Sequence, residues 1–159
     1  MDQELQSLTG KFGTFDPEVL AWPVSKLDPP LPLTVTENSS LLETIGCMKK
    51  HHIGSILVVN GGNELTGIFS ERDVLTKVIL SELELDATPI KSVMTCQPRV
   101  ETPCTSIAFV MRLMVEGGFR HVPLVNESKQ PIGIISIKDI LDFIEMEMVK
   151  HAADSELNS

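Results

Sequence analysis

The chain contains an internal repeat. Residues 23–80 align without a gap on residues 89–146, at a constant offset of 66 residues. Twelve aligned positions are identical, and conservative pairs such as Leu41 and Ile107 preserve the hydrophobic pattern between them. Two copies are too few for a solenoid. The duplication therefore predicts a two-fold symmetric body that has paired clefts where its halves meet.

Both copies predict the same order of elements. A β-prone stretch leads into a helix whose apolar residues fall on one face, and Ser39 or Ser40 is available as its N-cap. A buried strand, a turn, a second strand and a second helix follow. The β-prone stretches are residues 32–36 and 98–102, the first helix carries Leu41 to Met48, and the later strands are 55–59, 65–70 and 122–125. The fold class is α/β (α+β), with two tandem β-α-β-β-α motifs packed as a pseudo-two-fold pair.

Segments at both ends fall outside the repeat. Residues 1–22 form a lead-in, in which Asp16-Pro17-Glu18 has the composition of a helix start. The two motifs are expected to span residues 23–82 and 89–148. Residues 149–159 lack apolar periodicity, so we expect them to fray.

Composition restricts the classes of partner and compartment. The formal charge of −9 disfavours binding to nucleic acid or anionic membranes, and no apolar run approaches the roughly 20 residues that span a bilayer. The three cysteines have no CxxC spacing, and the acidic N-terminus does not resemble a signal peptide. We expect a soluble cytoplasmic protein.

The junction between the second strand and the second helix carries the most informative chemistry. It reads Ser70-Glu71-Arg72-Asp73 in one copy and Ser136-Ile137-Lys138-Asp139 in the other. A helix start has unbonded N–H groups and favours an anion, and the neighbouring cation adds to this preference. The aspartate carboxylate can accept hydrogen bonds from the two hydroxyls of a ribose. Together the residues match a ribose phosphate.

The same junction also fits a capping box that needs no ligand. In that interpretation Ser70 is the N-cap, and Asp73 closes the reciprocal hydrogen bond three residues later. Local sequence leaves both interpretations open.

These motifs resemble those of the CBS domain family, which occur in tandem pairs called Bateman modules. The resemblance rests on residues 67–74 and 133–140, together with residues 52–59 and 118–125, and extends from about Val24 to Met148. It implies two clefts that bind adenosine derivatives such as AMP, ADP, ATP or S-adenosylmethionine, with no other cofactor required. It also implies a homodimer and a regulated partner protein, which the sequence does not name.

Each cleft implied by the resemblance combines residues of both copies. The first comprises Ile68, Ser70, Arg72, Asp73, Thr102, Ile107, Phe119, Arg120 and His121. The second comprises Thr36, Leu41, Ile53, Gly54, Ile134, Ser136, Lys138 and Asp139. Phe119 is a candidate for stacking on an adenine ring, and a core aromatic is the equal alternative.

The two clefts differ in charge. The first contains two arginines, whose guanidinium groups suit phosphate oxygens, whereas the second has Gly54 at the position equivalent to Arg120. We therefore expect the Asp73 cleft to bind a phosphorylated adenosine more tightly than the Asp139 cleft.

No pattern of residues indicates catalysis or a metal site. The chain has no Walker loop and no GxGxxG segment, and the adjacent His51 and His52 lack a third ligand. The leading hypothesis is a regulatory module that senses an adenosine nucleotide and is not an enzyme. The alternative is a ligand-free homodimerisation or scaffold module.

Overall fold

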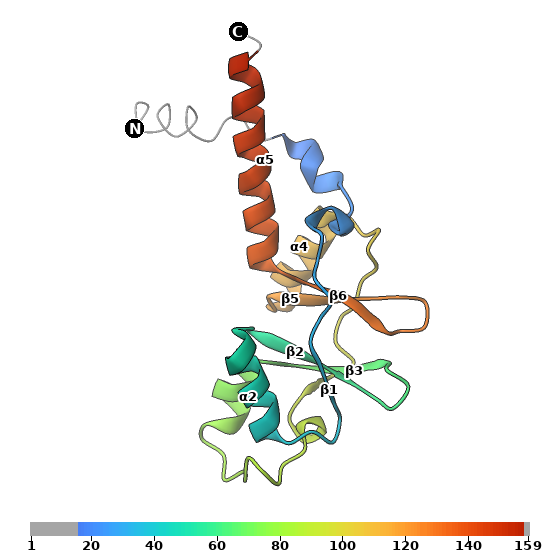
Figure 1. The fold of residues 1–159 in the computed structure, drawn as a ribbon, viewed down its shortest axis with the longest axis vertical. Coiled ribbons are helices and arrows are strands. Elements are labelled where there is room, and N and C mark those ends of the chain that lie inside the picture. Colours follow the sequence, from blue (N-terminus) through green and yellow to red (C-terminus); the bar gives the residue numbers. More distant parts are fainter. Residues whose placement is uncertain (1–15, 158–159) are drawn as a thin grey trace. The chain divides into compact units, whose positions relative to one another are not determined.

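A computed structural model describes residues 16–157, which form two compact units (Figure 1). Unit 1 contains residues 16–29, 103–120 and 135–157. Unit 2 contains residues 30–102 and 121–134. The elements in chain order are η1 (Pro17–Ala21), η2 (Val24–Leu27), β1 (Thr34–Thr36), α2 (Leu41–His51), β2 (Ser55–Val59), β3 (Leu65–Ser70), α3 (Glu71–Asp73), η3 (Val74–Val78), η4 (Ile90–Ser92), β4 (Thr95–Cys96), α4 (Ile107–Gly117), β5 (His121–Val125), β6 (Pro131–Ser136) and α5 (Ile137–Leu157).

Unit 2 contains a four-stranded sheet in the order β1-β2-β3-β4. Strand β1 runs parallel to β2, and the other neighbours are antiparallel. The β2–β3 register places Ser55 opposite Ser70. The end of β3, where the candidate site begins, is therefore held against the start of β2.

The core of unit 2 lies between this sheet and the helices beside it. Every residue of β2 is buried, as its continuous apolar sequence predicts. Capping supports the covering helix α2, because Ser40 and Glu43 exchange hydrogen bonds of 3.1 Å each at its start. The buried cluster comprises Leu41, Met48, Ile56, Val58, Phe69, Val78, Ile90 and Val93.

Unit 1 is built from α4, α5 and the two short 3-10 helices η1 and η2. The predicted lead-in helix is present as η1, where the Asp16 side chain accepts a hydrogen bond of 2.9 Å from the Glu18 backbone. The Trp22 and Phe143 rings meet edge to face, with their centroids 6.2 Å apart. This contact joins the segment after η1 to α5.

The start of each sequence repeat belongs to the unit that contains the first helix of the other repeat. In unit 1, Pro23 bridges Ser106, and the Ile107 N–H donates to the Trp22 carbonyl. In unit 2, Pro89 bridges Ser40, and the Leu41 N–H donates to the Thr88 carbonyl. The two units therefore exchange equivalent segments, because Pro23 and Pro89 are related by the 66-residue offset.

The predicted order β-α-β-β-α is confirmed in the first copy, and the second copy differs at its first strand. Residues 98–102 form only an isolated bridge, from Glu101 to Leu124. Pro98 begins this segment and Pro103 follows it, and neither proline has an N–H to donate, which limits the pairing of the segment. The short strand β4, which the sequence did not predict, instead pairs with β3.

The second helices of the two copies also differ from expectation. After α3 the chain forms a π-helix at η3, in which the Ile79 N–H donates to the Val74 carbonyl. Helix α5 is regular and continues to Leu157, past the end that the sequence predicts near Val149. A Lys150–Glu147 ion pair of 2.6 Å and the absence of Gly and Pro after Val149 support the longer helix.

Candidate functional site

The candidate site in unit 2 lies where β3 passes into α3. The Ser70 backbone N–H and hydroxyl both donate to Oδ2 of Asp73, at 2.8 and 2.7 Å. The Glu71 N–H donates to the Gly54 carbonyl at 3.0 Å, which ties the helix start to the residue just before β2. The capping box that the sequence predicts is thus present.

Lys77 occupies the other oxygen of the same carboxylate. Its Nζ lies 2.7 Å from Oδ1 of Asp73 and donates to the Val93 carbonyl at 2.9 Å. Burial alone raises the pKa of Asp73, but hydrogen bonds from Lys77 and Ser70 and the charge of Lys77 outweigh it, so the pKa lies below its ordinary value. Asp73 is therefore a buried, ion-paired carboxylate at neutral pH.

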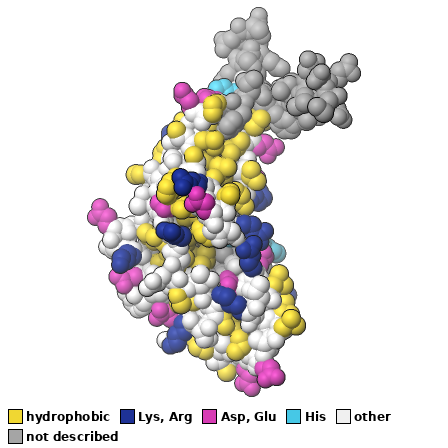
Figure 2. All heavy atoms as spheres, turned by 180° about the vertical axis from the view of Figure 1, so that it is seen from behind, with side chains coloured by type: hydrophobic (Ala, Val, Ile, Leu, Met, Phe, Trp, Pro, Cys, Tyr) yellow, Lys and Arg dark blue, Asp and Glu magenta, His cyan; other side chains and the backbone are white. Residues whose placement is uncertain are grey.

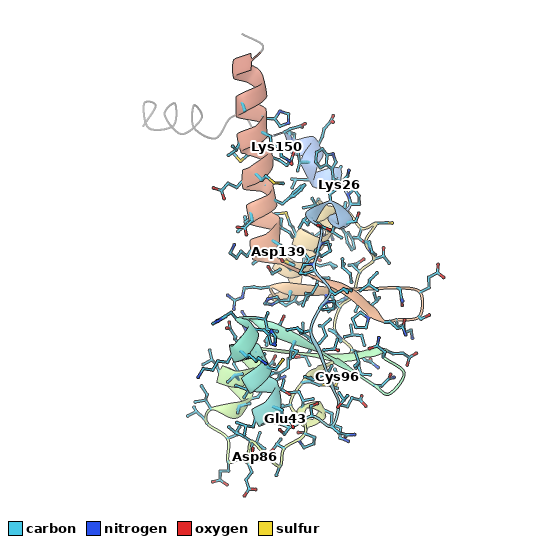
Figure 3. All side chains as sticks on the ribbon, in the orientation of Figure 1. Lys26, Glu43, Asp86, Cys96, Asp139 and Lys150 are labelled. Atoms are coloured by element: carbon cyan, nitrogen blue, oxygen red, sulfur yellow. The ribbon has the colours of Figure 1, made fainter. Side chains whose placement is uncertain are left out.

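The equivalent junction in unit 1 lies between β6 and α5, where Figure 3 labels Asp139. The Ser136 N–H and hydroxyl donate to Oδ2 of Asp139, both at 2.7 Å, and the Asp139 N–H returns a bond of 3.1 Å to the hydroxyl. The Ile137 N–H donates to the Arg120 carbonyl at 2.9 Å, as Glu71 does to Gly54. The backbone geometry of the site is thus repeated.

The environments of the two aspartates are unequal. Asp139 is exposed, whereas Asp73 is buried. Lys138, which the sequence offers as a phosphate ligand, forms an ion pair with Asp142, and this partner raises the pKa of Lys138. At the offset of 66, Phe143 stands where the first copy has Lys77. Asp139 therefore has an apolar side chain four residues on, where Asp73 has a cation.

The remaining predicted site residues lie in different environments. Leu41 and Ile107 are fully buried in the cores of their units. Phe119 is half-buried, and its ring lies so close to Gly117 that a Cβ there would collide with it. Thr36, Arg72, Thr102 and Arg120 are exposed, whereas Ile53, Gly54, Ile68, His121 and Ile134 are half-buried.

Each predicted cleft draws residues from both units, so its assembly stays a prediction. In the first cleft, Ile107, Phe119 and Arg120 belong to unit 1 and the other residues to unit 2. In the second cleft, Ser136, Lys138 and Asp139 belong to unit 1. What each unit presents by itself is a capped strand-to-helix junction with an aspartate at its third helical position.

Lys77 is the site residue that the sequence reasoning missed. Its repeat partner is a phenylalanine, and this exchange of charge for an apolar ring was the available signal. Within residues 16–157, no helix is both long enough and apolar enough to span a membrane, and no three His, Cys, Asp or Glu side chains cluster as metal ligands.

Comparison with known families identifies the family to which the repeat belongs. The CBS domain profile matches residues 26–80 and 90–146, which correspond to the two copies. The chain belongs to the CBS domain family. A 17.7 kDa protein from Acidianus ambivalens is 30% identical over 85% of this chain and 83% of its own length. An Arabidopsis thaliana CBS domain protein is 34% identical over 68% of this chain, which spans only 19% of that relative.

Solved structures share the fold of this CBS protein. A protein with CBS domains from Burkholderia ambifaria is 35% identical, with a TM-score of 0.68 over 82% of this chain and 93% of its own. The CBS domain protein of Pyrobaculum aerophilum, complexed with AMP, has a TM-score of 0.71 at 22% identity, covering 80% and 98% of the two chains. The CBS pair of MJ0100, complexed with 5′-methylthioadenosine and S-adenosylmethionine, has a TM-score of 0.68 at 22% identity, covering 76% and 98%. The last two likenesses concern the fold alone.

Proposed function

We propose that this CBS pair is a regulatory module that binds an adenosine nucleotide and reports its occupancy to a partner protein. The observation that carries the proposal is the repeated junction, in which a serine and an aspartate are fixed at the start of a helix in both units. Fold relatives complexed with AMP and with S-adenosylmethionine support an adenosine-type ligand. The module has no catalytic role in this proposal.

Linkage supplies the physical mechanism. The residues proposed for each cleft come from both units, so a bound nucleotide would contact both and would stabilise one relative orientation of the two. That orientation would then determine which surface the partner meets. The three free cysteines are consistent with action in the cytoplasm.

Ligand-dependent stability tests the proposal directly. A nucleotide present at 100 times its Kd should raise the free energy of unfolding by about 2.7 kcal/mol. We expect AMP, ADP, ATP or S-adenosylmethionine to shift the thermal midpoint of the wild-type chain, with NADH as a comparison. The shift should vanish in a chain that carries both Asp73→Ala and Asp139→Ala. If none of these compounds moves the midpoint, the nucleotide proposal is wrong.

The arginines lead us to propose that the Asp73 cleft is the tighter site for phosphate. Isothermal titration of Arg120→Ala and Asp139→Ala compares the two clefts, and we expect Arg120→Ala to cause the greater loss of AMP affinity. Binding that is abolished only by Asp139→Ala would reverse the ranking.

A ligand-free scaffold is the second candidate, and one observation favours it. The hydroxyl and backbone N–H of each serine already have their partner in the aspartate, so the capping hydrogen bonds of both junctions form without a ligand. The nucleotide panel separates the two functions, since a pure scaffold gains no stability from any of the compounds.

The helices of unit 2 lead us to propose a homodimer. A groove of about 820 Å³ lies between α2 and the helix after β3, and Lys49 and Glu71 border its apolar floor. Leu75 beside it is 64% exposed, and Figure 2 shows hydrophobic side chains gathered at this edge of the unit. A second copy in two-fold arrangement would cover this floor.

Substitution on this face tests the dimer. We expect Leu75→Glu to convert the sedimentation of the chain from dimer to monomer, because a charge would be buried in the contact. Leu31→Glu is the matched control, since Leu31 is 81% exposed but lies outside the helices. A Leu75→Glu chain that remains dimeric would place the contact elsewhere.

A further inference from the structure

The two aspartates differ by one in the number of acceptor positions that remain for a ligand. An ionised carboxylate has about four acceptor positions, two on each oxygen. Ser70 fills both positions on Oδ2 of Asp73, and Lys77 takes one on Oδ1. One position is left for a ligand, whereas the two neighbouring hydroxyls of a ribose offer two hydrogen bonds.

The second junction lacks this competitor. Ser136 fills Oδ2 of Asp139 in the same way, but the residue four positions later is Phe143, which has no hydrogen-bond donor. The Phe143 ring is committed to its contact with Trp22. Asp139 is exposed, and residue 143 takes neither of the two acceptor positions on its Oδ1.

Three contacts hold Lys77 in place. Besides Asp73, its Nζ donates to the Val93 carbonyl, and it lies 3.4 Å from Oγ1 of Thr95 on β4. The side chain is only 37% exposed, and the π-helix η3 carries it. A second ligand hydroxyl at Oδ1 of Asp73 would therefore have to displace an ammonium group that also donates to Val93 and Thr95.

We propose that Lys77 is a specificity-determining residue. Because Lys77 takes one acceptor position, Asp73 recognises one ribose hydroxyl, whereas Asp139 recognises two. This inference rests on the proposed nucleotide site and deepens it. The Asp73 half-site would accept a nucleotide in which one ribose hydroxyl is missing or modified. The Asp139 half-site would require an intact ribose.

Titration with paired analogues tests this assignment. The protein is the full chain carrying Asp139→Ala, and the probes are AMP, 2′-deoxy-AMP and 3′-deoxy-AMP. We expect one of the two analogues to bind within about threefold of AMP, because only one hydroxyl bond is made at Asp73. Adding Lys77→Met should make both analogues bind about tenfold or more weakly than AMP, the size of a hydrogen bond to a charged group.

Controls separate specificity from stability. Lys77→Arg should restore the wild-type ratios, and Lys91→Met removes an exposed charge of unit 2 without changing them. The inference is overturned if both analogues already bind tenfold more weakly than AMP while Lys77 is present, a result that does not depend on the folding of Lys77→Met. Unchanged ratios in folded Lys77→Met overturn it as well. If the unmodified chain does not bind AMP, the proposed function itself fails.

Discussion

Replacement of Phe69 by alanine should lower the free energy of unfolding by about 3–5 kcal/mol. Phe69 is fully buried and lies opposite Ile56 in the β2–β3 register. Alanine would leave a cavity in the cluster between the sheet and α2, and the buried apolar surface of the ring would be lost. A loss of this size is a large part of the 5–15 kcal/mol that is usual for a domain.

Urea denaturation measures the effect of the Phe69 substitution. We expect the midpoint to fall with little change of slope, since the surface exposed on unfolding is nearly the same. Phe109→Ala is the matched control, because Phe109 is 44% exposed on α4 and should cost less than about 1 kcal/mol. Equal losses for the two variants would contradict the assigned core. Because Phe69 directly precedes Ser70, the substitution should also lower nucleotide affinity through the end of β3.

The sequence repeat predicted the fold because burial follows the same offset. Leu41 and Ile107 are both fully buried, as are Val24 and Ile90. Hydrophobic periodicity reports on such positions directly, since each element has one face that leaves water. This is why the strands predicted at residues 55–59, 65–70 and 122–125 agree within one residue with β2, β3 and β5.

The differences between prediction and structure arise where local sequence competes with tertiary contacts. Strand β4 forms because β3 offers an unpaired edge. A strand of two residues is too short for a sequence pattern to predict this pairing. The exchange of the segments at Pro23 and Pro89 also depends on contacts with distant helices. Local propensity has no access to such contacts.

The candidate site was predictable in its residue types and less so in its electrostatics. The capping box needs only Ser and Asp three residues apart, which the sequence displays. The ion pair between Asp73 and Lys77 needs the helix geometry after β3, and the fixation of Lys77 on Val93 needs the distant connection to β4. The sequence shows the exchange of Lys77 for Phe143 between the two copies, but the contacts of Lys77 appear only in the folded structure.

Replacement of Asp73 by alanine should cost about 2–4 kcal/mol of unfolding free energy, from a lost cap of about 1 kcal/mol and lost hydrogen bonds to a charged group. The Lys77 ammonium would also be left without its carboxylate. Asp139→Ala should cost only about 0.5–2 kcal/mol, because Asp139 is exposed and serves mainly as a cap. Denaturation of the two variants in parallel measures this difference, and equal costs would contradict the buried ion pair.

The charge of Asp73 also predicts a pH dependence. Since its folded pKa lies below the unfolded value of 3.8, the carboxylate stabilises the fold above about pH 4, and that stabilisation is lost as the pH falls through the folded pKa. The difference in unfolding free energy between wild type and Asp73→Asn should therefore be constant from about pH 7 to 5 and shrink below about pH 4. In a Lys77→Met background this acid-side loss should shift to higher pH, because burial then raises the pKa of Asp73 with less opposition. If the shift is absent in that background, the stabilising partner of the carboxylate is not Lys77.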